Sequence, residues 1–209
     1  MNAAAFALWW KPFAALLLSY LLGSIPTGFL LVKWTKGIDV RTVGSGNVGA
    51  TNAARAAGRG VAFTVFVIDA LKGFISAALI ASLLWPEKGV VASAACGAAA
   101  VIGHVFPLFL NFQGGKGVAT AIGMLAAVSW QALVVFLLVW AIGMGLSRYV
   151  SVGSIFAAAT IPITQVVIHQ PLGAVLAGAA VALLIVLRHR GNIQRLFRGQ
   201  EHRLSFGSG

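Results

Sequence analysis

The sequence predicts an all-α integral membrane protein of about seven transmembrane helices with glycine-rich loops on one side of the membrane. Apolar runs long enough to cross a bilayer recur along the chain, and the few charged residues gather in polar segments between them. Of the 209 residues, 59% are hydrophobic and only 9% are charged, whereas soluble domains have about 25% charged residues. No linker or convincing repeat divides the chain, so we expect residues 1–209 to form a single polytopic domain.

The apolar runs can be taken in chain order, since a span needs about 20 residues. They cover residues 13–32, 61–85, 90–101 with a possible continuation to 110, 118–146, 152–168 and 172–187. The fourth run is too long for one untilted span, and Ser129-Trp130-Gln131 is a plausible turn within it. Pro86-Glu87-Lys88-Gly89 and His169-Gln170-Pro171 are further turn signals. Dividing the fourth run at Ser129 gives seven helices.

Two details of composition limit other interpretations. The single cysteine, Cys96, lies in an Ala/Gly-rich apolar run, so it forms no internal disulfide and reads as a small packing residue. No metal or redox function follows from it. The N-terminal region lacks a basic segment and a small-residue cleavage site, so we expect the first apolar run to remain as a helix.

The charge distribution predicts the orientation. The chain has 15 Lys and Arg against 4 Asp and Glu, a formal charge of +11. In a membrane protein this excess indicates the positive-inside rule and contact with anionic lipid rather than nucleic acid. Anionic substrates would be a third contribution, which depends on where the charges lie. Residues 33–60 and the tail from Arg188 carry five basic residues each. With seven helices these segments and the Lys116 loop all face the cytoplasm, whereas six helices would place the tail and that loop on opposite sides.

The first polar segment has the composition of an anion site. It reads Gly44-Ser45-Gly46-Asn47-Val48-Gly49-Ala50-Thr51-Asn52, with Arg55 shortly after. Glycines let backbone N–H groups approach an anion closely, and Arg55 adds a bidentate phosphate donor. Residues 50–57 look helical, so a helix N-terminus could point at the same anion. The alternative is an ordinary surface loop followed by a helix cap.

The second polar segment contains Gly114-Gly115-Lys116-Gly117 directly before an apolar helix. Its N–H groups and the Lys116 ammonium could cradle a phosphate, although the spacing is not that of a nucleotide-binding P-loop. His104, which precedes this segment, reads either as a ligand or as a packing histidine bonded to backbone, and the second is favoured.

The third polar segment is the basic tail. His189 and Asn192 share one helical face, and Glu201 can pair with a basic residue and so fix the tail. The alternative is a juxtamembrane segment that only binds anionic lipid. Within the second span, the spacing of Asp69 and Lys72 permits a buried ion pair, which favours a structural role over a place in a polar site wall.

Together the three segments resemble the three motifs of the bacterial acyl-phosphate:glycerol-3-phosphate acyltransferases, the PlsY family. Order, spacing and length agree over essentially the whole chain. Ser24-Ile25-Pro26-Thr27-Gly28 and Asp69-Ala70-Leu71-Lys72-Gly73 are also similar to family sequence. The resemblance implies transfer of an acyl chain from acyl phosphate to the 1-hydroxyl of glycerol 3-phosphate, giving 1-acyl-glycerol 3-phosphate and phosphate, the first acylation of phospholipid synthesis.

The resemblance also implies residue roles. The second motif, with Gly114, Gly115 and Gly117, holds the acyl phosphate, and Glu201 is structural. The catalytic residues around glycerol 3-phosphate and the reacting carbonyl are Ser45, Arg55, Lys116, His189 and Asn192. Further substrate contacts are expected from Gly44, Asn47, Thr51 and Asn52. We expect no cofactor, no metal and no obligate protein partner, and a location in the bacterial inner membrane with the site facing the cytoplasm.

The chemistry leaves the base open. The family lacks the His-x4-Asp motif of other glycerolipid acyltransferases, and no histidine in this chain has an aspartate five positions on. Either His189 or a phosphate oxygen of the substrate takes the hydroxyl proton. The substrate is favoured, because no carboxylate lies near His189 in sequence to orient it.

Two other classes of function are alternatives to an enzyme. A transporter or channel for a phosphorylated anion would suit broken helices and inward glycines. The polar segments gather at one face, however, and no ladder of charges crosses the membrane. A lipid-binding scaffold would need none of the glycine loops.

Overall fold

The structure is a computed structural model that describes residues 3–203, with side-chain burial from Trp10 onward. The described residues form helices and loops, and none of them forms a strand. The fold is therefore all-α, as predicted. The chain divides into two compact units, Met1–Val128 and Ser129–Gly209, and each is described by itself.

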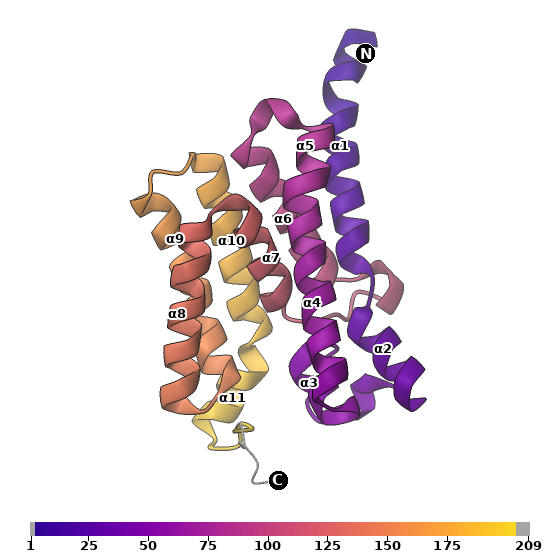
Figure 1. Ribbon diagram of the computed structural model, residues 1–209, viewed down its shortest axis with the longest axis vertical. Coiled ribbons are helices and arrows are strands. Elements are labelled where there is room, and N and C mark those ends of the chain that lie inside the picture. The colour runs from indigo at the N-terminus through magenta and orange to yellow at the C-terminus, as the bar shows by residue number, and fades with distance from the viewer. Residues whose placement is uncertain (1–2, 204–209) are drawn as a thin grey trace. The chain divides into compact units, whose positions relative to one another are not determined.

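The described residues of the first unit, 3–128, form seven α-helices and four short helical turns. In chain order they are α1 (Ala3–Ser24), α2 (Thr27–Lys36), η1 (Val40–Thr42), α3 (Ala50–Ala57), α4 (Arg59–Ile75), η2 (Ser76–Ile80), α5 (Ala81–Leu84), η3 (Pro86–Lys88), α6 (Val90–Val105), η4 (Leu108–Leu110) and α7 (Val118–Val128). The main packing pairs are α1 with α6 and α4 with α7 (Figure 1). Glycines make this packing close, since a Cβ on Gly123 would overlap the carbonyl of Ala70.

The first span differs from its predicted form. Residues 13–32 were expected to make one continuous helix, but the chain breaks between Ser24 and Thr27 and then runs helically to Lys36. Pro26 accounts for the break, because proline has no N–H to donate and its ring obstructs the preceding turn. The helix also extends into what was expected to be polar loop.

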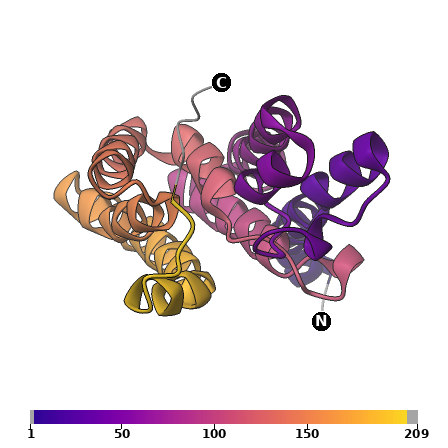
Figure 2. The ribbon, with the colours of Figure 1, turned by 90° about the horizontal axis from the view of Figure 1, so that it is seen from below.

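Residues 129–203, the part of the second unit that the structure describes, form four α-helices. They are α8 (Trp130–Ser147), α9 (Val150–Val167), α10 (Leu172–Arg188) and α11 (Arg190–Phe197). The α9 helix packs against both α8 and α10 (Figure 2). The predicted division of residues 118–146 is confirmed at Ser129, whose hydroxyl accepts a hydrogen bond of 3.2 Å from the N–H of Ala132 and so caps α8.

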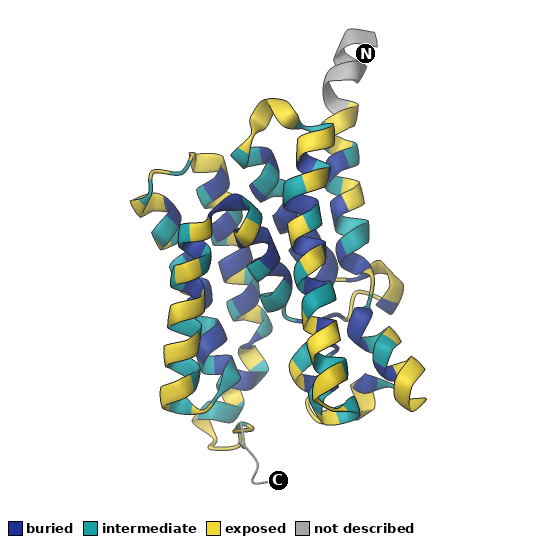
Figure 3. Ribbon diagram, viewed as in Figure 1, coloured by how far each residue is buried: buried dark blue, intermediate teal, exposed yellow. Residues whose placement is uncertain are grey.

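Among residues 3–203, five helical segments are long and apolar enough to cross a membrane: Trp10–Lys36, Arg59–Leu84, Val90–Leu110, Trp130–Ser147 and Val150–Val167. The pair α10 and α11, bent by 48°, makes a sixth if it is one span, and α7 is a shorter apolar helix. The predicted seven is therefore an approximate count. Large apolar side chains are exposed, including Leu138 and Leu146 on α8. Figure 3 shows exposed residues along the helices of the ribbon. Exposed apolar surface of this kind marks a membrane contact.

Candidate active site

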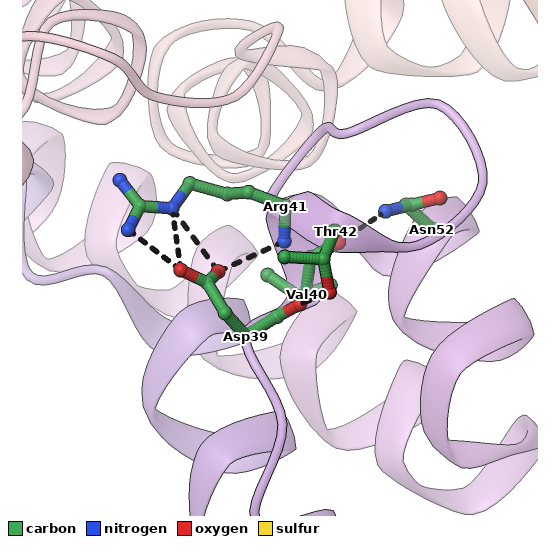
Figure 4. Close-up of polar contacts among 5 residues, drawn as sticks. All are labelled: Asp39, Val40, Arg41, Thr42 and Asn52. Carbon is green, nitrogen blue, oxygen red and sulfur yellow. Dashed lines mark hydrogen bonds and ion pairs between the residues drawn. The ribbon is translucent and has the colours of Figure 1, made fainter.

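Asn52 organises the first polar segment. Its side chain is buried, at 1% exposure, and its amide nitrogen donates to the carbonyls of Val40 and Val43 at 2.9 Å each. Its Oδ1 accepts from the N–H of Ser45 at 3.0 Å. Figure 4 shows the side chain of Asn52 directed at Val40. Asn52 therefore closes the loop on itself, and its predicted contact with substrate stays a prediction.

The glycines of this segment fit the tight path that Asn52 imposes. Gly44 has φ +57° and Gly46 has φ +69°, a region that side chains rarely adopt. A Cβ on Gly44 would lie 2.5 Å from Asn52 Oδ1 and 3.1 Å from the Cδ of Arg55. The geometry thus requires glycine at position 44.

Short-range contacts fix the rest of the segment. Asn47 Oδ1 accepts from the N–H of Gly49 at 2.8 Å, directly before α3. Ser45, in the loop before α3, and Thr51, in the first turn of α3, are both exposed. Both residues are therefore accessible at the start of this helix.

Two arginines of this region differ in their partners. Asp39 accepts from the backbone N–H of Arg41 at 2.9 Å, and its carboxylate also binds the guanidinium at 2.6 Å (Figure 4). The hydrogen bonds from the Arg41 side chain and backbone lower the pKa of Asp39 below its usual value. Arg41 also lies over the ring of Phe29. Arg55 is exposed, and no carboxylate of residues 3–203 pairs with it, so it is available to an anion.

The second segment corrects one expectation. The N–H of Gly114 donates to the carbonyl of Val105 at 3.1 Å, and the N–H of Gly115 donates to that of His104 at 3.0 Å. These groups satisfy the end of α6, so the prediction that both serve as donors of a phosphate cradle is wrong in that detail. Gly117 has φ +84° and its carbonyl accepts from Ala121, which starts α7. Lys116 is half-buried beside that helix N-terminus.

A buried polar cluster lies on the helices before this segment. The predicted pair is present, with Lys72 Nζ 2.7 Å from Asp69 Oδ1 and both side chains at 3% exposure or less. Lys72 also donates to the carbonyl of Ile25, at the break between α1 and α2. The Nδ1 of His104 lies 3.7 Å from Asp69 Oδ1. His104 is thus buried as predicted, but its neighbour is a carboxylate from another helix.

In the second unit, His189 lies at the bend between α10 and α11 and is 2% exposed. Its Nδ1 lies 2.8 Å from the carbonyl of Ile185. A carbonyl only accepts, so Nδ1 carries the proton and a neutral ring has its lone pair on Nε2. The backbone therefore orients His189, in place of the carboxylate that is absent from the nearby sequence.

The carboxylate of Glu201 accepts hydrogen bonds from three side chains in the second unit. Its Oε1 accepts from Ser151 at 2.9 Å and from Asn192 at 2.6 Å, and its Oε2 accepts from Arg195 at 2.8 Å. Burial alone would raise the pKa of Glu201, but the hydrogen bonds from Asn192, Arg195 and Ser151 outweigh it and lower the pKa. The predicted pairing of Glu201 with a basic residue is confirmed. Ser151 had no signal in the sequence, since it lies 50 residues away.

The first and second segments both belong to the unit Met1–Val128, and the third belongs to the unit Ser129–Gly209. Among residues 3–203, no group of three or more His, Cys, Asp or Glu side chains is placed to hold a metal. The donors present are instead hydroxyls, amides and cations, which suit phosphate groups.

Comparison with known proteins decides the family. The sequence model described as glycerol-3-phosphate acyltransferase matches residues 13–199. The chain belongs to the glycerol-3-phosphate acyltransferase family. It is therefore an acyltransferase and an integral membrane protein of lipid synthesis.

Relatives and solved structures of this family are similar along nearly the whole chain. The glycerol-3-phosphate acyltransferase of Myxococcus xanthus is 44% identical, over 91% of this chain and 98% of its own. That of Trichormus variabilis is 42% identical, over 91% of each. A crystal structure of PlsY in its glycerol 3-phosphate form is 42% identical, covers 93% of this chain and 96% of its own, and has a TM-score of 0.87. A second, the lysophosphatidic acid form, has a TM-score of 0.84 at 41% identity, over 93% of this chain and 95% of that one.

Proposed function

We propose that this acyltransferase moves an acyl group from acyl phosphate to the 1-hydroxyl of glycerol 3-phosphate. The hydroxyl oxygen attacks the acyl carbonyl carbon and forms the ester bond. The bond between that carbon and the phosphate oxygen breaks, and phosphate leaves. The products are 1-acyl-glycerol 3-phosphate, a lysophosphatidic acid, and inorganic phosphate.

One observation supports the proposed acceptor, glycerol 3-phosphate, and the proposed product, lysophosphatidic acid. The PlsY structures similar to this chain are a glycerol 3-phosphate form and a lysophosphatidic acid form, which correspond to the substrate and product of such a transfer. The donor is what the resemblance of the three polar segments to the PlsY motifs implies, and the absence of a His-x4-Asp motif from the sequence agrees with it. An acyl phosphate is already activated for acyl transfer. Binding the two phosphate groups and placing the hydroxyl next to the carbonyl therefore account for most of the reduction in the activation barrier.

The basic residues offset the repulsion between two anionic substrates. Two like charges 4 Å apart repel by about 4 kcal/mol at an intermediate dielectric. We assign Arg55 to the phosphate of glycerol 3-phosphate, because its guanidinium is exposed and unpaired beside Gly44. Lys116, half-buried at the start of α7, is assigned to the acyl phosphate. Ser45 and Thr51 supply hydroxyls near Arg55.

In the second unit His189 and Asn192 are assigned to the reacting hydroxyl and carbonyl. With Nδ1 donating to Ile185, Nε2 is the nitrogen that meets the substrate hydroxyl. A phosphate oxygen of the substrate takes the hydroxyl proton, and His189 places the hydroxyl. Nε2 must then donate to the hydroxyl oxygen, so both ring nitrogens carry protons. A ring with its lone pair on Nε2 would instead accept that proton itself. Asn192 is held by Glu201, so Glu201 acts through position rather than by contact.

The proposed location is the bacterial inner membrane with the polar segments facing the cytoplasm, which the distribution of Lys and Arg supports. Single cysteines introduced at Ser45, Gln113 and Gln194 are expected to react with an impermeant thiol reagent from the cytoplasmic side. Cysteines at Glu87 and Gln170 are expected to react from the other side. Opposite sidedness for Ser45 and Gln194 would contradict this orientation.

The reaction is tested by phosphate release from purified protein in detergent. With a long-chain acyl phosphate, release should require glycerol 3-phosphate and match the lysophosphatidic acid formed. Acyl-CoA, given in place of acyl phosphate, should yield no product. Product from acyl-CoA alone, or no transfer from acyl phosphate, would rule out the proposed donor.

A further inference from the structure

We infer that His104 is a positioning residue for the segment 114–117, and that residue 115 is glycine because the imidazole of His104 occupies the space beside it. The buried cluster of Asp69, Lys72 and His104 has no part in the transfer proposed above. The part of the test that measures activity rests on the proposed function, in which Lys116 of this segment binds the acyl phosphate.

The first evidence is the contact between His104 and the segment. The carbonyl of His104 accepts the N–H of Gly115 at 3.0 Å. A Cβ on Gly115 would overlap Nε2 of the ring and lie 2.9 Å from Cδ2 and Cε1. The backbone and the side chain of His104 therefore both fix where Gly115 lies, and no side chain fits between them.

The second evidence is that the ring is held from its other edge. Nδ1 of His104 lies 3.7 Å from Asp69 Oδ1, and Asp69 is paired with Lys72 at 2.7 Å. Lys72 in turn donates to the carbonyl of Ile25 at the break between α1 and α2. Ionic groups inside a membrane protein are costly unless they are paired, so this arrangement resists rearrangement. The ring cannot swing away from Gly115 without losing its place beside Asp69.

A methyl group at position 115 must therefore displace either the ring or the segment. Displacement of the segment moves Lys116 and Gly117, the two residues directly before α7. The expected effect is weaker use of acyl phosphate, with little change in the use of glycerol 3-phosphate.

The test is a double-mutant cycle with His104→Asn. The shorter amide keeps a polar group near the position of Nδ1 and removes the ring atoms that oppose Gly115. Gly115→Ala alone should raise KM for acyl phosphate by about tenfold or more, as overpacking does. In the His104→Asn background the same change should raise it by less than about threefold. The KM for glycerol 3-phosphate should stay nearly constant in all four proteins.

Gly114→Ala is the matched control. A Cβ there would overlap the carbonyl of His104 and lie 2.4 Å or more from neighbouring atoms of Pro107 and Val105, which His104→Asn leaves in place. Its defect should persist in the His104→Asn background. If the defect of Gly115→Ala also persists undiminished, the substrate or another group opposes the methyl and the inference fails.

Thermal unfolding separates this inference from the proposed function. Gly115→Ala should lower the midpoint of unfolding of the detergent-purified protein without substrate, and His104→Asn should reduce that loss. This coupling is measured even if acyl phosphate is not the donor. Should His104→Asn fold poorly, His104→Ala serves in the same cycle, and additive shifts in midpoint would overturn the inference.

Discussion

Asn52 and Glu201 each accept or donate three hydrogen bonds, yet they organise their segments in different ways. Asn52 is a neutral amide bonded only to backbone groups of one loop, those of Val40, Val43 and Ser45. Glu201 is a carboxylate bonded to side chains, those of Ser151, Asn192 and Arg195. The first sets the path of a loop, whereas the second sets the directions of side chains.

The difference extends to the residues assigned to the reaction. In the first unit the assigned cation Arg55 is exposed on a short helix, and the loop beside it has a fixed backbone. In the second unit His189 is buried and oriented by a backbone carbonyl. We therefore expect changes at His189 to affect turnover and changes at Arg55 and its loop to affect the use of glycerol 3-phosphate.

The largest effect is expected at His189. If His189 is the general base, its removal in His189→Ala should lower turnover by about 10²–10⁴-fold, the range for general acid–base catalysis. If it only places the hydroxyl, as proposed, the loss should be smaller than that of a lost base. His189→Asn should recover part of this loss, because Asn still offers a hydrogen bond to the hydroxyl.

The pH–rate profile at saturating acyl phosphate then identifies the base. A substrate phosphate has its second ionisation near pH 6, so the decline of rate toward acid should remain in His189→Asn. Loss of that acid limb in the variant would instead assign the base to His189.

A smaller effect is expected at Arg55. Arg55→Ala should lower kcat/KM for glycerol 3-phosphate by about 10–150-fold, which corresponds to loss of a charged hydrogen bond of about 1.5–3 kcal/mol. Arg59→Ala removes an equally exposed arginine at the start of α4 and is the control for general electrostatic attraction. Equal losses in the two variants would argue against a direct contact from Arg55.

Much of this arrangement was predictable because it is local in sequence. The pair Asp69–Lys72 follows from helical spacing, and the break at Ser129 follows from the length of the apolar run and a turn signal. Glu201 was expected to pair within the tail, and it does so with Arg195.

The contacts that sequence reasoning missed join distant segments or depend on backbone geometry. Ser151 binds Glu201 from α9, and His104 meets Asp69 from another helix. Neither pair has a spacing that identifies it. The N–H groups of Gly114 and Gly115 looked available in the sequence, but the turn after α6 folds back and uses them. Glycine content alone predicts close approach and does not say what approaches.

Asn52 gives a more modest effect on activity. Asn52→Ala leaves two carbonyls and one N–H of the loop without their partner, so it should reduce stability by about 1–3 kcal/mol. It should also raise KM for glycerol 3-phosphate by about tenfold, since Ser45 loses its fixed position. Asn47→Ala removes one local hydrogen bond and should do less on both measures. A larger effect at Asn47 would mean that its side chain, rather than the loop path, serves the substrate.

The smallest effect, and the one that tests the comparison most directly, is the pH dependence of stability at Glu201. The folded protein lowers the pKa of Glu201, so the folded state favours the ionised carboxylate. This contribution to stability is complete above the ordinary pKa of about 4.5 and is lost as pH falls through the lower, folded value. Glu201→Gln should remove this one carboxyl's contribution, so at pH 7 the variant should be less stable than the wild type by about 1 kcal/mol, and at about pH 3 by less.

Asn52→Asp introduces a carboxylate among backbone carbonyls and should show the opposite trend, with the larger loss of stability at pH 7. Thermal unfolding of the three proteins at the two pH values measures both. The difference in stability between the wild type and Glu201→Gln should be smaller at about pH 3 than at pH 7. If it is the same at both, the charge of the carboxylate does not stabilise the third segment, and Glu201 differs from Asn52 only in the geometry of its hydrogen bonds.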